Sequence, residues 1–344
     1  MRAILYAFLA AVFYAVNIPL SKLLLKSVGP TAMAALLYLG AGIGVGALSL
    51  FDVRGRKSSA PLTRGDLPFV IGMIVLDIAA PILLMLGIRY GSAANASLLG
   101  NFEIVATTVI ALVLFKEAVS ARLWSAIALI TVASAILSLE GSESFRFSYG
   151  SLLVLLATVC WGFENNCTRR ISTKSTYEIV VLKWMFSGAG ALIVAFVVRE
   201  PMPDLPHIGA VLLLDFVAYG LSIFLYVRAQ SVLGAAKTSA YYAVAPFAGV
   251  LLSFAILGER FSGRFFAALA VMIAGAALVV IDTLITRHEH PHQHVFSHCH
   301  GGAIHEHTVE HRHAHDHCPG PEKHTHHHPL AQLEAIADGG TKNP

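Results

Sequence analysis

Long apolar segments make up most of the chain, and short polar stretches separate them. The clearest segment runs from Gly29 to Phe51, 23 residues without a charge. A helix needs about 20 apolar residues to cross a hydrocarbon core of about 30 Å. Ten such segments are predicted: Ala3–Ser21, Gly29–Phe51, Leu67–Ile88, Ser92–Phe115, Leu123–Leu139, Tyr149–Thr168, Ile179–Val198, Ile208–Val227, Ala235–Leu257 and Phe265–Ile281. The pattern therefore predicts an all-α integral membrane protein with ten transmembrane helices.

The composition agrees with this pattern. The 344 residues are 56% hydrophobic and only 13% charged, and the mean hydropathy is +0.68. Soluble domains carry about 25% charged residues, so the composition excludes a soluble protein. The first segment, which follows Arg2, could also be a signal peptide, but it is long and has no clear small-residue cleavage site.

Lysines and arginines between the segments predict the orientation in the membrane. With the N-terminus inside, the inner loops hold ten of these residues and the outer ends and loops hold seven. Ten crossings then place both termini in the cytoplasm. We expect the membrane to be the plasma membrane, which is the inner membrane of a bacterium. The four cysteines, Cys160, Cys167, Cys299 and Cys318, are not expected to form a disulfide framework there.

One sequence pattern occurs twice along the chain. Leu114–Glu117 ends one apolar segment, Ile256–Glu259 ends another 142 positions later, and an arginine follows each at a distance of five residues. Repeats of this size inside an apolar chain are typical of membrane transporters. Five crossings per half is an odd number, so we expect two inverted five-helix repeats, 1–140 and 141–285, followed by a tail, 286–344.

Further matches resemble a known family. Tyr241–Pro246, followed by Ile256–Glu259, is close to the signature of the EamA branch of the drug/metabolite transporter superfamily. In the first half Ile104 replaces the usual proline and Lys116 the usual glycine. The resemblance covers residues 1–285 and implies ten helices, a central substrate cavity and alternating access. It does not specify a substrate, because the family carries amino acids, sugars, nucleotide precursors and drugs.

Four carboxylates fall inside predicted membrane segments, where a charged group is costly and usually faces a cavity. Asp77 and Asp215 lie near the middle of the third and eighth segments and are related by the repeat, while Glu103 and Glu164 lie in the fourth and sixth. Two acidic groups that face one cavity suit a cation substrate or a proton relay. We therefore predict that Asp77 and Asp215 carry the proton or cation.

Lysines offer a structural interpretation of the same carboxylates. Lys183 in the seventh segment and Lys237 near the start of the ninth could pair with them, although Lys237 could instead extend to the cytoplasmic surface. Lys183 also matches a basic residue that the EamA branch often carries in the second helix of a half.

Aromatic residues lie one turn before two matched polar positions, Asn17 and Glu164, a pattern found both in cavity walls and in packed cores. The predicted substrate or proton pathway comprises Asp77, Asp215, Glu103, Glu164, Asn17, Lys183, Tyr14, Trp161, Tyr241 and Tyr242. The predicted hinges are Pro19, Pro81 and Pro246, because proline inside a helix removes a backbone donor. Each proline could instead serve packing alone.

The tail has a different composition from the rest of the chain. Sixteen of the 17 histidines lie there, many at every second position. With few apolar residues, the tail is expected to be disordered without a ligand. Its candidate ligands for nickel, cobalt, zinc or copper are His288, His290, His292, His294, His298, Cys299, His300, His305, His307, His311, His313, His315, His317, Cys318, His324, His326, His327 and His328.

Three functions remain open from the sequence. The first is a secondary transporter of a small solute, with a divalent transition metal as cargo and the tail as its collector or sensor. The second is an exporter of an amino acid or another small organic metabolite, with a regulatory or incidental tail. The third is a membrane-anchored metal buffer or sensor. No GxSxG or Walker motif occurs, and the HExxH string at His288–His292 lies in the tail and contains a proline, unlike a zinc-binding helix. We therefore expect neither enzyme activity, nor ATP hydrolysis, nor a required cofactor, nor a nucleic-acid partner.

Overall fold

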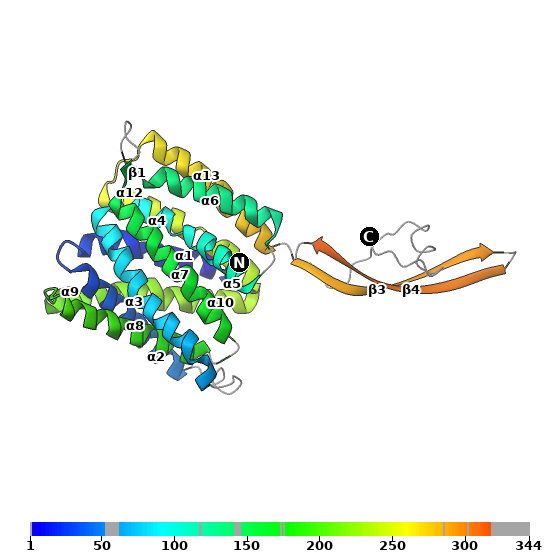
Figure 1. Ribbon diagram of the computed structural model, residues 1–344, viewed down its shortest axis with the longest axis horizontal. Coiled ribbons are helices and arrows are strands. Elements are labelled where there is room, and N and C mark those ends of the chain that lie inside the picture. The colour runs from blue at the N-terminus through cyan, green and yellow to red at the C-terminus, as the bar shows by residue number, and fades with distance from the viewer. Residues whose placement is uncertain are drawn as a thin grey trace. The chain divides into compact units, whose positions relative to one another are not determined.

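The computed structural model shows a bundle of long helices (Figure 1). It describes residues 2–51, 62–116, 119–140, 146–172, 174, 176–284, 286–300 and 303–317. The chain divides into two compact units, Met1–Val280 and Ile281–Pro344. The predicted loop charges Arg54, Arg56 and Lys57, the repeat residue Glu117, and the tail from Cys318 onward lie outside the described residues.

The first five predicted segments all coincide with helices. The elements are α1 (Arg2–Leu24), α2 (Pro30–Phe51), the 3-10 turn η2 (Arg64–Asp66), α3 (Leu67–Tyr90), α4 (Ala93–Leu99), α5 (Phe102–Phe115) and α6 (Ala121–Ser138). The fourth segment is therefore two helices, α4 and α5, with a break at Gly100 and Asn101. A short hairpin of β1 (Leu139–Glu140) and β2 (Arg146–Phe147) connects α6 to the second half.

The second five segments are helical as well. The elements are α7 (Tyr149–Ile171), α8 (Thr176–Val197), α9 (Leu205–Asp215), the π-helix η3 (Phe216–Leu221), α10 (Ser222–Leu233), α11 (Ala235–Tyr242), α12 (Ala245–Leu257) and α13 (Gly263–Leu284). The ninth segment is broken between α11 and α12, at the position that the repeat makes equivalent to the break between α4 and α5. Pro246 consequently stands in the first turn of α12, where proline is tolerated, and not inside a helix as predicted.

Apolar side chains cover the outside of the bundle, and its inside holds many alanines and several polar groups among larger apolar side chains. Leu251 of α12 is 69% exposed and Leu213 of α9 is 63% exposed, whereas many of the fully buried side chains are alanines. The apolar outer surface is unlike that of a soluble protein and is suited to a lipid environment. The protein is therefore a multi-pass membrane protein.

Within the described residues, seven helical segments are long and apolar enough to cross a membrane, and two shorter apolar helices, Pro30–Gly44 and Val181–Val197, accompany them. The sixth predicted segment, α7, is in neither group, and its second half carries Glu164, Asn165 and Asn166. The number of ten crossings stays a prediction.

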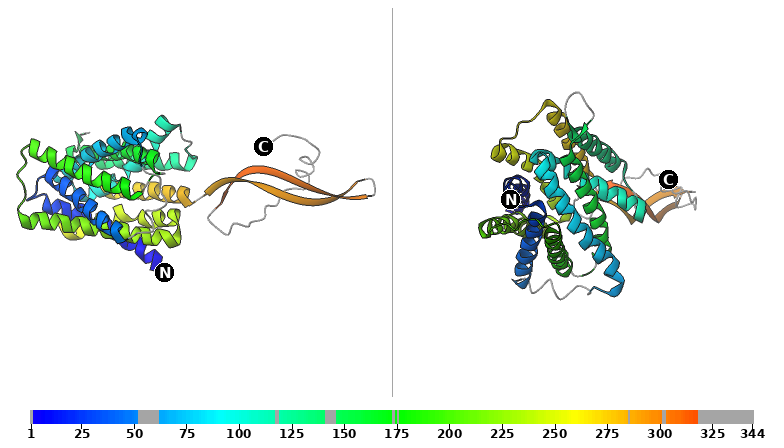
Figure 2. Two further views of the ribbon diagram at one scale, coloured as in Figure 1. Left: turned by 90° about the horizontal axis from the view of Figure 1, so that it is seen from below. Right: turned by 60° about the vertical axis from the view of Figure 1, so that its left-hand side comes forward.

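Helices of one half pack mainly on helices of the other. α7 lies along α3 and α5, and α1 lies along α10 and α12, so that the first helix of each half contacts the third and fourth segments of the other half. Figure 2 shows these helices side by side along the length of the bundle. Gly150 of α7 permits a close approach to α3, because a Cβ there would lie 2.6 Å from the Gly91 backbone nitrogen.

Polar side chains cap helix ends at one end of the bundle. Glu200, which follows α8, accepts hydrogen bonds from the backbone N–H groups of Thr31 and Ala32 at the start of α2. Glu259, which follows α12, accepts from the N–H groups of Ala93 and Ala94 at the start of α4. These carboxylates satisfy donors that a helix terminus leaves free.

The second unit contains an antiparallel pair of strands, β3 (Thr286–His300) and β4 (Ala303–His317), whose register runs from Thr286↔His317 to His300↔Ala303. A histidine at every second position has the period of a strand. Disorder of the tail in solution, together with its metal binding, stays a prediction.

Candidate functional site

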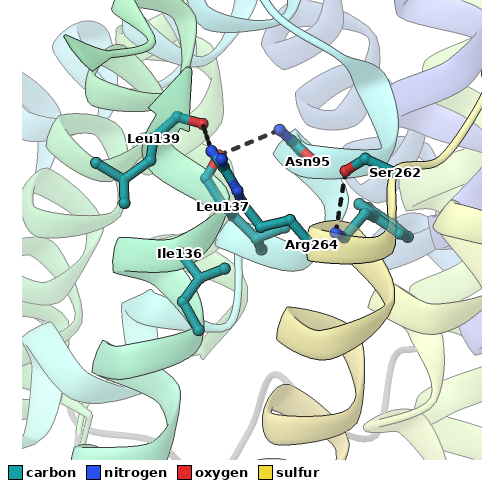
Figure 3. A pocket seen from close by; sticks show the side chains of 7 residues that line it. Asn95, Ile136, Leu137, Leu139, Ser262 and Arg264 are labelled. Atoms are coloured by element: carbon teal, nitrogen blue, oxygen red, sulfur yellow. Dashed lines mark hydrogen bonds between the residues drawn. The ribbon is translucent and has the colours of Figure 1, made fainter. Parts of the chain in front are cut away.

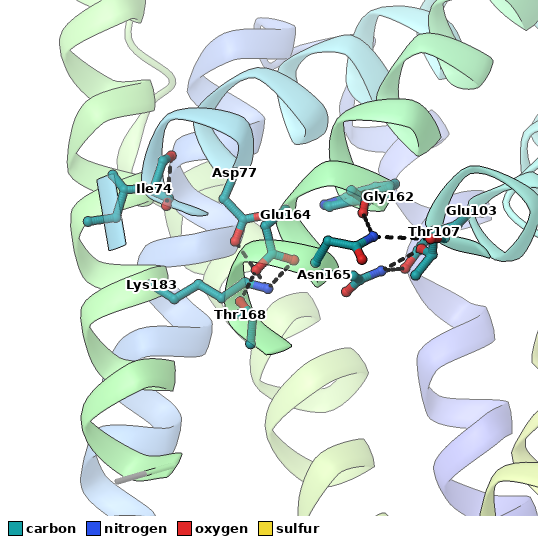
Figure 4. A network of polar contacts seen from close by, with 12 residues as sticks. Ile74, Asp77, Glu103, Thr107, Gly162, Glu164, Asn165, Thr168 and Lys183 are labelled. Atoms are coloured by element: carbon teal, nitrogen blue, oxygen red, sulfur yellow. Dashed lines mark hydrogen bonds and ion pairs between the residues drawn. The ribbon is translucent and has the colours of Figure 1, made fainter. Parts of the chain in front are cut away.

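A lysine whose side chain is 20% exposed joins two buried carboxylates inside the bundle. The Lys183 Nζ of α8 lies 2.9 Å from a Glu164 oxygen of α7 and 3.2 Å from a carboxylate oxygen of Asp77 on α3 (Figure 4). Asp77 and Glu164 are 0% and 1% exposed. Three helices therefore contribute one charge each to a single cluster, which we call the Lys183 cluster.

Neutral side chains form further hydrogen bonds around the Lys183 cluster. The Tyr38 hydroxyl of α2 donates to Asp77 at 3.4 Å and accepts from the Trp161 indole N–H at 3.2 Å. The Thr168 hydroxyl donates to Glu164 one helical turn further along α7. A buried ion pair survives in a low-dielectric interior only with such additional hydrogen bonds.

Glu103 lies in a second polar group next to this cluster. Its carboxylate accepts a hydrogen bond of 2.7 Å from the Asn165 side-chain amide, which also donates to the Thr107 hydroxyl at 3.2 Å (Figure 4). Glu103 occupies the first turn of α5, directly after the break that follows α4. The N-terminus of a helix favours a negative charge, so the break places Glu103 where a carboxylate is stabilised.

Two cavities meet at the broken helices. The smaller, of about 220 Å³, is lined by Tyr14, Tyr38, Glu103, Trp161, Glu164, Asn165, Lys183, Trp184, Ala218, Tyr219, Ser222, Ile223 and Tyr242. The larger, of about 410 Å³, has mainly apolar walls that include Ile18, Leu84 and Val154. Tyr14, Glu103, Trp161 and Tyr242 line both. A volume of a few hundred Å³ suits a small organic molecule.

Asp215 is separate from both cavities and from the Lys183 cluster. It ends α9 next to the π-helix, it is fully buried, and neither carboxylate oxygen has a hydrogen-bond partner in the part of the chain that the structure describes. Gly40 makes room for it, because a Cβ there would lie 2.8 Å from an Asp215 oxygen. Asp77 and Asp215 are also absent from the walls of the two cavities, so the single acidic cavity expected from their repeat relationship is not what the geometry has.

Most of the other predicted pathway residues lie around the cavities. Tyr14, Trp161 and Tyr242 are wall residues, and Asn17 of α1 lines the larger cavity while donating to the Tyr219 hydroxyl at 3.2 Å. Tyr241 instead packs its ring against Phe8, with centroids 5.4 Å apart.

The two predicted lysine partners differ in their surroundings. Lys183 is the partner of the buried carboxylates, whereas Lys237 is exposed. Pro19 and Pro81 lie inside α1 and α3. Among the described residues, Cys160 and Cys167 are free thiols.

The sequence did not reveal Tyr38, Asn165, Trp184 or Tyr219 as site residues. Tyr38, Trp184 and Tyr219 are aromatic residues in apolar segments, where such residues are usual, and Asn165 lies beside the more conspicuous Glu164. Tyr219 had one usable signal, since it lies four residues after Asp215 and therefore near it on a helical surface. The contacts of the others depend on which helices pack together.

A third cavity of about 370 Å³ lies between α4, α6 and α13 (Figure 3). Arg264 donates there to the Leu139 carbonyl and Asn95 to the Leu137 carbonyl, each at 3.3 Å. These bonds satisfy carbonyls at the end of α6, so its polar groups serve the structure of the bundle.

No group of three or more histidine, cysteine, aspartate or glutamate side chains arranged to hold a metal ion occurs in the part of the chain that the structure describes. The Lys183 cluster has two carboxylates, but the lysine occupies the place that a cation would take. A divalent ion would therefore have to displace Lys183.

A helical bundle with apolar outer faces and an internal cavity at broken helices defines a multi-pass membrane protein with a polar interior. The model of the EamA-like transporter family matches residues 1–139 and 148–281. The chain belongs to this family, which confirms the resemblance read from its repeated segments and makes it a membrane transporter.

Individual relatives agree with this assignment. An uncharacterized transporter of Methanothermobacter thermautotrophicus is 24% identical over 274 residues, which are 74% of this chain and 78% of that protein. The uncharacterized transporter YyaM of Bacillus subtilis is 22% identical over 283 residues, 80% of this chain and 90% of that protein. A solved crystal structure superposes with a TM-score of 0.59 at 19% identity, covering 82% of this chain and 96% of its own, and supports the fold alone.

Proposed function

We propose that the protein is a secondary transporter that moves a small organic solute by alternating access, without ATP. The observation that carries the proposal is the pair of cavities at the broken helices, next to the Lys183 cluster. Short or interrupted helices at corresponding positions of two halves mark the binding sites of many transporters. An interior of this kind serves no purpose in a membrane anchor, which argues against a buffer or sensor that is only held by its helices.

The packing supports two inverted halves. α1 contacts the third and fourth segments of the second half, and α7 contacts the equivalent segments of the first half. Contacts that are exchanged in this way are expected of a two-fold relationship between the halves. Movement of one half against the other would then open the cavities to either side of the membrane.

Asp215 is the proposed proton carrier. An ionised carboxylate without a partner is costly in a buried site, whereas a protonated one is much less so. The neighbouring π-helix can change its hydrogen bonding without unfolding, as such segments often do at functional sites. We propose that Asp215 is protonated in this conformation and releases its proton when the bundle opens.

Flux measurements in liposomes test the proposal. Purified protein would be reconstituted with a trapped pH-sensitive dye and exposed to amino acids, organic amines, sugars and nucleosides. We expect at least one solute to cause saturable flux, coupled to proton movement that Asp215→Asn abolishes. Absence of flux for every solute would refute a transport function, and undiminished proton movement in Asp215→Asn would refute the role of Asp215.

A metal cargo is the second candidate, because of the histidine-rich tail. Uptake of nickel, cobalt and zinc by vesicles would be compared between the full chain and a truncation after Arg287. If metal is the cargo or the tail collects it, truncation should lower uptake severalfold. Unchanged metal uptake would remove this support and leave the organic solute.

A further inference from the structure

The charges around the two cavities do not balance. Lys183 is shared between Glu164 and Asp77, so it cannot compensate Glu103 as well. Glu103 accepts from the neutral Asn165 amide and forms no ion pair with any described residue. With these groups ionised, the smaller cavity is lined by two carboxylates, Glu103 and Glu164, and by one lysine, Lys183, which also pairs with Asp77. The lining therefore has an excess of negative charge, and Glu103 is the group that lacks a cation.

Aromatic rings surround the uncompensated carboxylate. Tyr14 packs edge-on against Tyr219 with centroids 5.5 Å apart and lies 5.7 Å from the Tyr242 ring. Trp184 in turn packs against Tyr219 at 6.3 Å. All four rings line the smaller cavity together with Glu103. The face of an aromatic ring attracts a cation, and the attraction is strongest where water is excluded.

The larger cavity offers space for an apolar group. It continues from the shared wall of Tyr14, Glu103 and Tyr242 and is bounded by side chains such as Ile18 and Leu84. Its volume of about 410 Å³ accommodates a ring or a branched alkyl chain.

Resting on the function proposed above, we propose that the substrate is an organic cation with an apolar body. Its ammonium group binds Glu103 among the rings of Tyr14, Tyr219 and Tyr242, and its apolar body fills the larger cavity. An anion would meet excess negative charge. A zwitterion would need Lys183 for its carboxylate, and Lys183 already has two. A bare metal ion would gain nothing from the apolar walls.

Binding to a matched set of probes tests the charge requirement. The full-length protein in nanodiscs would be titrated with phenethylamine, benzyltrimethylammonium, the neutral 2-phenylethanol and the anion 3-phenylpropionate, and with nickel chloride as a metal probe. Fluorescence of Trp161 and Trp184 reports on the cavity. The two cations should bind at least tenfold more tightly than the neutral and anionic probes.

Variants then assign the binding to this site. Glu103→Gln should weaken binding of the cations tenfold or more, Glu103→Asp should weaken it less, and the distant Asp204→Asn, which keeps a good helix cap, should leave it unchanged. Tyr14→Phe keeps the ring and should bind nearly as well, whereas Tyr14→Leu should lose several fold. Each variant must elute as a monodisperse species with an unchanged unfolding temperature.

The outcomes separate this inference from the transport function. Saturable flux of a neutral, anionic or metal substrate, with no preference for the cations, would overturn the inference and leave the transporter intact. Equal cation binding by Glu103→Gln and the unmodified protein would overturn it as well. Failure of every solute to bind or move would refute both.

Discussion

Lys183 holds two carboxylates together that would otherwise repel each other. Lys183→Met should leave Asp77 and Glu164 buried without a counter-charge, and breaking a buried ion pair in this way costs about 3–5 kcal/mol. We expect a markedly lower unfolding temperature in detergent and loss of flux. The exposed Lys237 provides the matched control, since Lys237→Met should change neither quantity. A normal unfolding temperature for Lys183→Met would show that the cluster does not stabilise the fold.

Two equivalent residues of the repeat share an unusual backbone conformation. Lys116, after α5, has φ 54°, and Gly258, after α12, has φ 63°, so both end their helix in the left-handed region. A side chain costs about 1–2 kcal/mol there, which glycine avoids. Lys116→Gly should therefore stabilise the protein by about 1 kcal/mol and Gly258→Ala should destabilise it by a similar amount. Thermal unfolding checks both, and a loss of stability in Lys116→Gly would contradict the argument.

Helices α4 and α11 each end where a longer predicted segment was expected to continue. The sequence predicted the whole segments Ser92–Phe115 and Ala235–Leu257, because apolar residues span both. It did not predict the breaks, since Asn101 and Ala243 are tolerated inside helices. Only Pro246 signalled an interruption, and its equivalent in the first half is Ile104. At the breaks α4 packs on α12, a contact that hydropathy does not report.

The contribution of the α4 cap to stability can be measured. Besides the two backbone groups, Glu259 accepts a hydrogen bond from the Ser92 hydroxyl at 2.9 Å. Glu259→Ala should cost about 1–3 kcal/mol, because it leaves donors at a helix terminus without partners. Neighbouring Arg260 is exposed, so Arg260→Ala serves as the control. Equal unfolding temperatures for the two variants would show that the cap contributes nothing.

The arrangement of the whole molecule makes a topological prediction. In a protein whose native cysteines are replaced, single cysteines at Ser27, Met202 and Ser262 should react with an impermeant reagent from outside intact cells. Cysteines at Thr63 and Gly234 should react only after permeabilisation. These positions lie at alternate ends of the helices, so inverted halves with both termini inside require this pattern. Reaction of Ser27 and Met202 from opposite sides would contradict it.

The sequence predicted the helices and the family of the protein better than the contacts within its site. Each predicted apolar segment coincides with helical elements, although the number of crossings stays a prediction, and the repeat led to the family. The relationship between Asp77 and Asp215 was harder, because equal depth does not imply equal surroundings: Lys183 lies beside one of them only. The contacts of Tyr38 and Asn165 join residues more than 35 positions apart, and one sequence carries no record of such pairs.

The carboxylates that cap α2 and α4 are synthesised long after the helices that they cap. Glu200 follows its partner Thr31 by 169 positions, and Glu259 follows Ala93 by 166. At a synthesis rate of about 5–20 residues per second, roughly ten to thirty seconds pass between the synthesis of each helix and that of its capping carboxylate. The first half alone lacks both of these capping groups. Fragments of this protein should therefore assemble only when both are made together, and a chaperone or insertase has an interval in which to hold the earlier helices.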